Sequence, residues 1–133
     1  MNIDDLLNDV IDVRDLIARF EELENEWNDV VGEPSDEAVE WMKENGEEFK
    51  TLKQLLEELE GNGGDEQWRG AWYPLTLISA NYFTSYCKEL CEDIGDIPRD
   101  IPHYIEIDWE GTAQNIKVDY VEVTIDGHDY LYR

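Results

Sequence analysis

The segment from Cys91 to Gly111, CEDIGDIPRDIPHYIEIDWEG, holds the residues whose types and spacing could do chemistry. It contains seven carboxylates, one arginine and one histidine. Carboxylates at this density could hold a metal ion, carry out general acid/base catalysis, or present negative charge to a basic partner. The rest of the chain favours the third of these interpretations.

Metal binding is not favoured by the spacing of the ligand-forming residues. A calcium loop needs oxygen ligands at alternating positions around a central glycine, and Asp126, Gly127 and Asp129 fit a turn instead. Among residues that bind transition metals, only Cys87 and Cys91 have a spacing typical of ligands. On a helix these cysteines share one face, and we expect them to be reduced thiols. We therefore expect no metal and no cofactor.

Catalysis is not favoured either. Because the chain has 34 acids, some pair of carboxylates is inevitable, and a pair alone does not indicate glycoside hydrolysis. No serine lies in a G-x-S-x-G setting. The GNGG run at 61–64 lacks the lysine of a phosphate-binding loop and is flanked by acids. We expect that the chain is not an enzyme.

The overall composition excludes two classes of ligand. The chain has 133 residues, with 34 acids and 10 bases, and its formal net charge is −24. Nucleic acids and anionic membranes both require basic residues in their partners, so direct binding to either is not expected. A hydrophobic content of 41% indicates a globular fold. Because the chain has no stretch of about twenty apolar residues and no basic, apolar leader, we expect a cytoplasmic protein.

The pattern of residues 1–60 predicts an acidic helical region. Apolar residues at intervals of three and four predict a first helix that begins at Ile3 and continues to Val31. Gly32 and Pro34 are expected to end it.

Two further helices are expected before the glycine-rich run. Ser35 is expected to cap a short helix over 36–45, which Gly46 would end in a left-handed conformation. A third helix, with one apolar face, is expected to continue to Leu59. The GNGG run then predicts a loop.

Residues 61–133 predict an α+β region. The segment 68–79 is short and apolar, and because Pro74 interrupts it we expect an irregular segment or an edge strand. The alternating segments 120–125 and 128–132, joined by Asp-Gly, predict a β-hairpin. The chain is therefore expected to be a helix-rich α+β protein, either as two regions divided near residue 60 or as one continuous domain.

Two helices are expected between these β segments. The first is predicted over 82–94 and ended by Gly95, and the second is predicted over 109–119 with Asp108 as its cap. The prolines between them predict an extended connection. Three isoleucines of that connection are expected to pack inward: Ile97, Ile101 and Ile105.

The spread of charge over the whole chain suggests imitation of DNA. Residues 1–60 carry a net charge of −15 and residues 61–133 one of −9, so the acidity is not confined to a tail. At about one charge per 1.7 Å, a net charge of −24 corresponds to about 40 Å of duplex. A compact chain of this length is about 35–40 Å across. Because such charge opposes compaction, it indicates attraction to a basic surface, although a halophilic or merely soluble protein is a simpler alternative.

Three stretches of the C-terminal half carry a more specific pattern. They are YFTSYCKELCEDIGDIP from Tyr82, DIPHYIEIDWEGTAQNIKVDYVEV from Asp100 and DGHDYLYR from Asp126. Together they resemble the C-terminal part of the ArdA antirestriction proteins of plasmids, transposons and phages. The positions that match that family's motifs are Glu92, Asp93, Ile94, Gly95, Pro98, Asp100, Ile101, Tyr104, Asp108, Trp109, Glu110, Ala113, Ile116, Gly127 and Tyr130.

The resemblance implies an acidic, elongated and dimeric DNA mimic from a phage or other mobile element. Such a protein would occupy the basic DNA-binding groove of a Type I restriction-modification enzyme in a bacterial host cell. The segment from Pro98 corresponds to the family's antirestriction motif. The carboxylates expected to form the DNA-mimicking surface, each in place of a phosphate, are Glu89, Glu92, Asp93, Asp96, Asp100, Glu106, Asp108, Glu110, Asp119 and Glu122.

Two alternatives remain open. An anti-CRISPR protein would use the same kind of surface to fill the nucleic-acid channel of a CRISPR effector. A protein-protein adaptor would instead dock the apolar stripe of its N-terminal helices on a partner, with the charge serving only solubility. Salt separates the adaptor from the mimics, because phosphate-like contacts weaken steeply between about 50 and 200 mM salt and a helix in a groove hardly responds.

Overall fold

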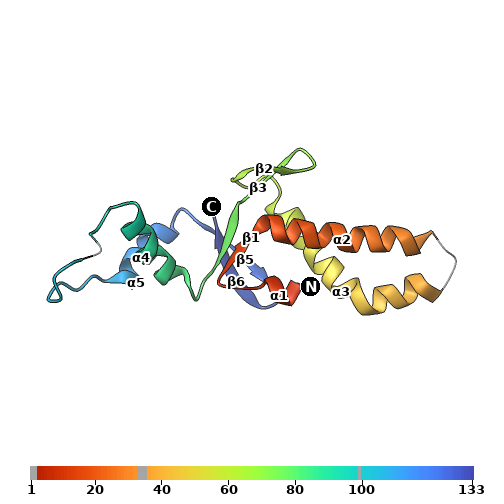
Figure 1. The fold of residues 1–133 in the computed structure, drawn as a ribbon, viewed down its shortest axis with the longest axis horizontal. Helices are drawn as coiled ribbons and strands as arrows, with labels where there is room; N and C mark the ends of the chain where they lie inside the picture. Colours follow the sequence, from red (N-terminus) through yellow and green to blue (C-terminus); the bar gives the residue numbers. More distant parts are fainter. Residues whose placement is uncertain (1–2, 33–35, 99) are drawn as a thin grey trace.

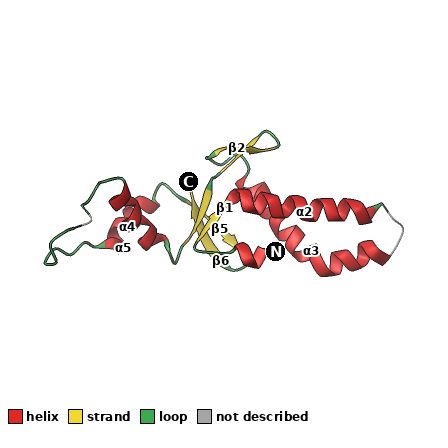
Figure 2. Cartoon of the chain, in the orientation of Figure 1, coloured by secondary structure: helices red, strands yellow, loops and turns green. Residues whose placement is uncertain are grey.

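The protein is elongated, with a β-sheet between two helical ends (Figure 1). The computed structural model describes residues 3–32, 36–98 and 100–133. A helical hairpin forms one end, and two shorter helices with a long connection form the other (Figure 2). The predicted helix-rich α+β class is confirmed. None of the helices within the described ranges has the length and hydropathy needed to cross a membrane.

The N-terminal segment is not the single helix that the apolar pattern predicted. Helix α1 (Ile3–Leu6) is followed by strand β1 (Val10–Asp12) and helix α2 (Val13–Val31). The Asp12 carboxylate accepts a hydrogen bond from the backbone N–H of Arg14 at 3.0 Å, so it caps α2 and fixes its start. The expected end of this helix is confirmed at Gly32, whereas Pro34 lies outside the described residues.

The next helical segment is one helix instead of two. Helix α3 (Asp36–Leu59) is continuous, so the prediction that Gly46 ends a helix in a left-handed conformation was wrong. A Cβ on Gly46 would lie 2.6 Å from the Met42 Sδ atom, so this glycine leaves room for the methionine side chain. The predicted cap, Ser35, lies outside the described residues.

Aromatic stacking and one ion pair hold α2 against α3. The Phe20 and Phe49 rings stack with centroids 5.2 Å apart, in a core that continues along both helices. The Arg19 guanidinium donates to the Glu48 carboxylate at 2.6 Å, and both side chains are nearly buried. Burial lowers the pKa of Arg19, but its hydrogen bonds to Glu48 and Glu22 outweigh that effect and raise it. Glu48 also accepts from the Ile3 N–H at 3.0 Å, so one carboxylate joins α1, α2 and α3.

The central sheet has four antiparallel strands in the order β1-β4-β6-β5. Strands β5 (Val121–Ile125) and β6 (His128–Tyr132) form the predicted hairpin. Asp126 and Gly127 both have positive φ at its turn, as a type I′ turn requires. Strand β4 (Thr76–Ser79) lies between β1 and β6, so this part of 68–79 is neither irregular nor an edge strand.

A second, two-stranded sheet precedes β4. Strands β2 (Asp65–Trp68) and β3 (Ala71–Tyr73) pair antiparallel. The turn between them, Arg69-Gly70, has positive φ at both residues, as the Asp-Gly turn does. The Trp68 ring packs edge-on against Phe20 at 5.6 Å, which places this hairpin over α2.

The two faces of the four-stranded sheet bury different helices. One face shares a core with α2 and α3 through residues that include Leu77, Val123 and Tyr130. On the other face, Ile78 and Leu131 pack with helix α4 (Phe83–Asp93) and helix α5 (Trp109–Lys117). The N-terminal and C-terminal halves of the chain therefore share one sheet, which has a separate core on each face.

The predicted end of α4 before Gly95 and the predicted start of α5 at Asp108 are confirmed, whereas α5 ends at Lys117 and not at Asp119. Gly95 follows α4 with a φ of +80°, and Asp108 caps α5 by accepting from the Gly111 N–H at 2.9 Å. The connection between the two helices is more open than expected. Ile97 and Ile101 are half-buried. Ile105 is 46% exposed, so the prediction that it packs inward was wrong.

Two glycines between α3 and β2, Gly61 and Gly64, differ in how closely the surrounding backbone approaches them. Both Gly61 and Gly64 have positive φ, but only at Gly64 would a Cβ overlap the backbone carbonyl of Tyr73. Gly61→Ala should therefore cost about 1–2 kcal/mol, from φ alone. Gly64→Ala should cost clearly more, because β3 must also move. Urea denaturation of both variants would measure the two free energies of unfolding, and equal costs would contradict this account of the Gly64 contact.

Candidate acidic interface

Nine of the ten predicted carboxylates lie in one part of the molecule, which we call the acidic lobe (residues 82–119). It consists of α4, α5 and the connection between them, at the end of the molecule opposite the helical hairpin (Figure 1). Glu122 is the exception, because it lies on β5 in the central sheet. All ten are exposed apart from Glu92, which is half-buried.

Two of these carboxylates already have a structural role. Asp108 accepts the hydrogen bond that caps α5, and a Cβ on Gly111 would lie 2.6 Å from its second carboxylate oxygen. The Tyr82 hydroxyl donates to both carboxylate oxygens of Glu89, at 3.1 Å. That hydrogen bond is the main reason why the pKa of Tyr82 is raised. Asp108 and Glu89 are therefore held in defined orientations.

Most of the other carboxylates of the acidic lobe are available to a partner. The side chains of Glu92, Asp96, Asp100, Glu106, Glu110 and Asp119 form no hydrogen bond or ion pair with the described residues. Two of them follow helix C-termini, since Asp96 lies after α4 and Asp119 after α5. Negative charge is unfavourable there because of the helix dipole. These positions raise the local negative potential at a cost in stability.

Several carboxylates outside the acidic lobe are instead paired with arginine. Arg14 pairs with Asp12 at 2.7 Å, and Arg69 pairs with Glu24. The hydrogen bond from Arg14 lowers the pKa of Asp12. None of these pairings was predicted, because their partners come together only in the folded chain or across a helix cap.

The charge per unit length is lower than the sequence estimate assumed. Helix α3 has 24 residues, so it is about 36 Å long, and the sheet and acidic lobe lie beyond its end (Figure 1). The molecule is therefore longer than the 40 Å of duplex with the same charge. Helices α2 and α3 together hold 14 acids and five bases. Their net charge of −9 is less than half of what about 36 Å of duplex carries.

Apolar side chains are exposed among the carboxylates of the acidic lobe. Ile94 is 61% exposed, Tyr104 is 77% exposed and Val118 is 79% exposed. The His103 and Tyr104 rings lie edge to face, with centroids 5.7 Å apart. Aromatic and apolar groups are enriched in the interfaces between proteins, where they form contiguous patches. Sequence patterns did not reveal the exposure of these side chains, since apolar residues are usually expected inside.

Other chemistry has little support in the described part of the chain. No group of three or more His, Cys, Asp or Glu residues there has a geometry that could hold a metal ion. Cys87 and Cys91 are free thiols, and burial raises the pKa of Cys87. A buried thiol of raised pKa is a poor nucleophile.

Comparison with known proteins gives no further assignment. No protein-family model matches the chain, and no curated protein or solved structure is significantly similar to it.

The unpaired carboxylates should repel one another measurably. A variant with Asp96→Asn, Asp100→Asn, Glu106→Gln and Asp119→Asn should have a higher urea midpoint than the wild type at about 10 mM salt. The gain should shrink at about 1 M salt, because the Debye length falls from about 30 Å to about 3 Å. Asp108→Ala is the contrasting variant and should lose about 1 kcal/mol at both salts, because it removes a helix cap. A gain that does not depend on salt would contradict repulsion as its cause.

Proposed function

We propose that the protein is an acidic DNA mimic that blocks the DNA-binding groove of a bacterial defence enzyme, most directly a Type I restriction-modification enzyme. The observation that carries the proposal is the acidic lobe, where six carboxylates are unpaired among the described residues. The resemblance of the same segment to ArdA proteins supports the proposed target. The protein would act in the cytoplasm of the host cell, without catalysis and as a possible homodimer.

The charge on the surface supports attraction to a basic groove. Among the described residues no charged side chain is buried in the core, so the excess negative charge is directed outward. A field of this sign attracts a basic groove and accelerates association. Duplex DNA carries a condensed counterion atmosphere, so a protein of lower linear charge density can still compete for a groove that binds DNA.

The position of the charge also favours a protein partner of basic character. Exposed Ile94, Tyr104 and Val118 accompany the carboxylates of the acidic lobe. DNA has phosphates but no aliphatic side chains on its surface, so these residues would add contacts that DNA lacks. The mimic would then need fewer charges than the duplex it displaces.

An inhibition assay with a purified Type I restriction enzyme tests the proposal. The protein should prevent cleavage of unmethylated DNA, and excess short duplex DNA should displace it from the enzyme. Binding should weaken steeply between about 50 and 200 mM salt. If duplex DNA does not displace it, mimicry is ruled out. If the protein leaves the restriction enzyme unaffected but binds a CRISPR effector, and nucleic acid displaces it from that effector, the CRISPR effector is the target.

Two variants with the same loss of charge locate the contact. One carries the four acidic-lobe substitutions given above, and the other carries Glu26→Gln, Asp29→Asn, Glu40→Gln and Glu44→Gln in the helical hairpin. The acidic-lobe variant should bind the enzyme about tenfold more weakly at about 50 mM salt, from a few tenths of a kcal/mol per charge. The helical-hairpin variant should lose less than about threefold. Equal losses of affinity in the two variants would show that binding depends on net charge and not on the acidic lobe.

A further inference from the structure

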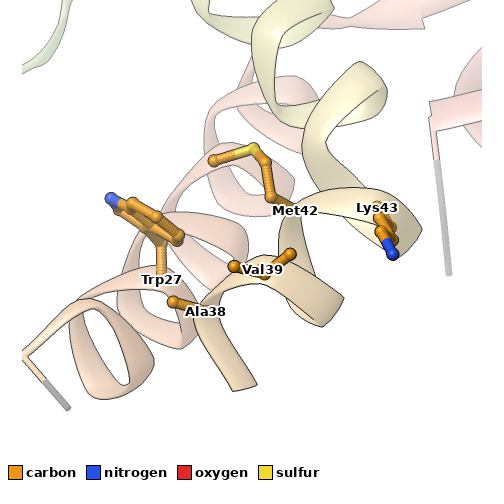
Figure 3. Close-up of a pocket in the computed structure, with 5 residues that line it drawn as sticks. All are labelled: Trp27, Ala38, Val39, Met42 and Lys43. Carbon is orange, nitrogen blue, oxygen red and sulfur yellow. The ribbon is translucent and has the colours of Figure 1, made fainter. Parts of the chain in front are cut away.

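The free end of the helical hairpin carries an apolar pocket that the acidic lobe does not use. It is an open hollow of about 410 Å³, lined by Trp27 from α2 and by Ala38, Val39, Met42 and Lys43 from α3 (Figure 3). Val39 is 58% exposed and Met42 is 41% exposed. The aliphatic part of Lys43 extends the same surface. We call these five residues the hairpin pocket.

The hairpin pocket has a firm base. The Trp27 and Trp41 rings pack with centroids 5.4 Å apart, and Trp41 packs in turn against Phe49 at 5.5 Å. Trp41 is a member of the buried core. The pocket is therefore a surface extension of the core between α2 and α3, while the flexible Met42 side chain can adapt to different occupants.

Its surroundings are strongly acidic. The stretches 25–31 and 36–45, which contain the pocket residues, hold six carboxylates and one basic residue, Lys43. All six are exposed: Glu26, Asp29, Asp36, Glu37, Glu40 and Glu44. An apolar floor with an acidic rim complements a segment with apolar side chains on one face and lysine or arginine beside them. A second copy of this chain is disfavoured, because it would bring six further carboxylates against the same rim.

We infer that the hairpin pocket docks a basic amphipathic helix of a partner protein, which inserts one or two large apolar side chains between α2 and α3. A helix suits the site because the pocket residues of α3 follow a stripe along that helix, at positions 38, 39, 42 and 43. The inference goes beyond the proposed function and does not rest on it. The two surfaces lie at opposite ends of the molecule (Figure 1).

Two peptides of equal charge provide the probe. The first is a capped peptide of roughly 14 residues, about four helical turns, with lysines on one face and leucines at helical spacing on the other. The second has alanine in place of each leucine. At about 150 mM salt the leucine peptide should bind the full-length protein at least about tenfold more tightly, because only leucine fills the hairpin pocket. Raising the salt to about 500 mM should weaken both peptides and preserve their ratio.

Methyl NMR reports whether the pocket itself is occupied. The chain has two methionines, so methyl labelling gives a simple spectrum in which the Met42 signal reports on the pocket. The leucine peptide should shift the Met42 signal, and the alanine peptide should not. An unshifted Met42 signal at saturation would overturn the inference.

Matched variants separate the pocket from general apolar attraction. Val39→Ser with Met42→Gln should remove the difference in affinity between the two peptides. Ile94→Gln with Val118→Ser removes comparably exposed apolar groups from the acidic lobe and should leave that difference intact. Peptide binding would lie elsewhere if the variant of Val39 and Met42 kept the difference in affinity. It would also lie elsewhere if the variant of Ile94 and Val118 lost that difference. Neither measurement involves a DNA-binding enzyme, so its outcome is independent of the inhibition assay.

Discussion

The pairing of β4 with β6 is the interaction on which both ends of the molecule depend. Ile78 lies opposite Leu131, and Ser79 lies opposite Tyr130, in antiparallel register. Because neighbouring side chains alternate between the two faces of a sheet, Leu77 and Tyr130 support the helical hairpin while Ile78 and Leu131 support the acidic lobe. A slip of one residue would exchange the two sets and expose both cores. These central strands therefore fix the separation of the two charged ends.

Elongation lowers the electrostatic cost of carrying this charge. Like charges spaced along a rod repel one another less than the same charges on a sphere. The protein uses part of its few basic residues to hold its elements together, since Arg19 joins α2 to α3 and Arg69 joins the β2–β3 hairpin to α2. Carboxylates at those positions are neutralised, whereas several in the acidic lobe are not. Both ends of the molecule remain negative, since the acidic lobe holds nine acids and three bases and the two helices of the hairpin hold 14 acids and five bases.

Local signals in the sequence predicted the elements whose boundaries are set by turn and cap chemistry. The Asp126-Gly127 hairpin, the cap at Asp108 and the glycine after α4 each follow from one or two residues. The errors came where tertiary contacts decide the conformation. Strand β1 exists because β4 pairs with it, and α3 continues through Gly46, where the Met42 side chain fills the space that a Cβ would take. The ten carboxylates could be chosen from sequence, and the cap at Asp108 was predicted, but the hydrogen bond that holds Glu89 depends on the fold.

The two candidate surfaces differ in the physics that governs them. Charge in the acidic lobe acts over about a Debye length, so it sets how fast a basic partner arrives and how strongly salt opposes binding. The hairpin pocket acts only on contact, through the removal of Trp27, Val39 and Met42 from water, which salt hardly changes. A partner that engaged both ends would associate fast, in a step that salt slows. It would dissociate slowly, in a step that salt hardly changes. Affinity at physiological salt would then depend mainly on the apolar contact, and specificity on the distance that the central sheet maintains between the two ends.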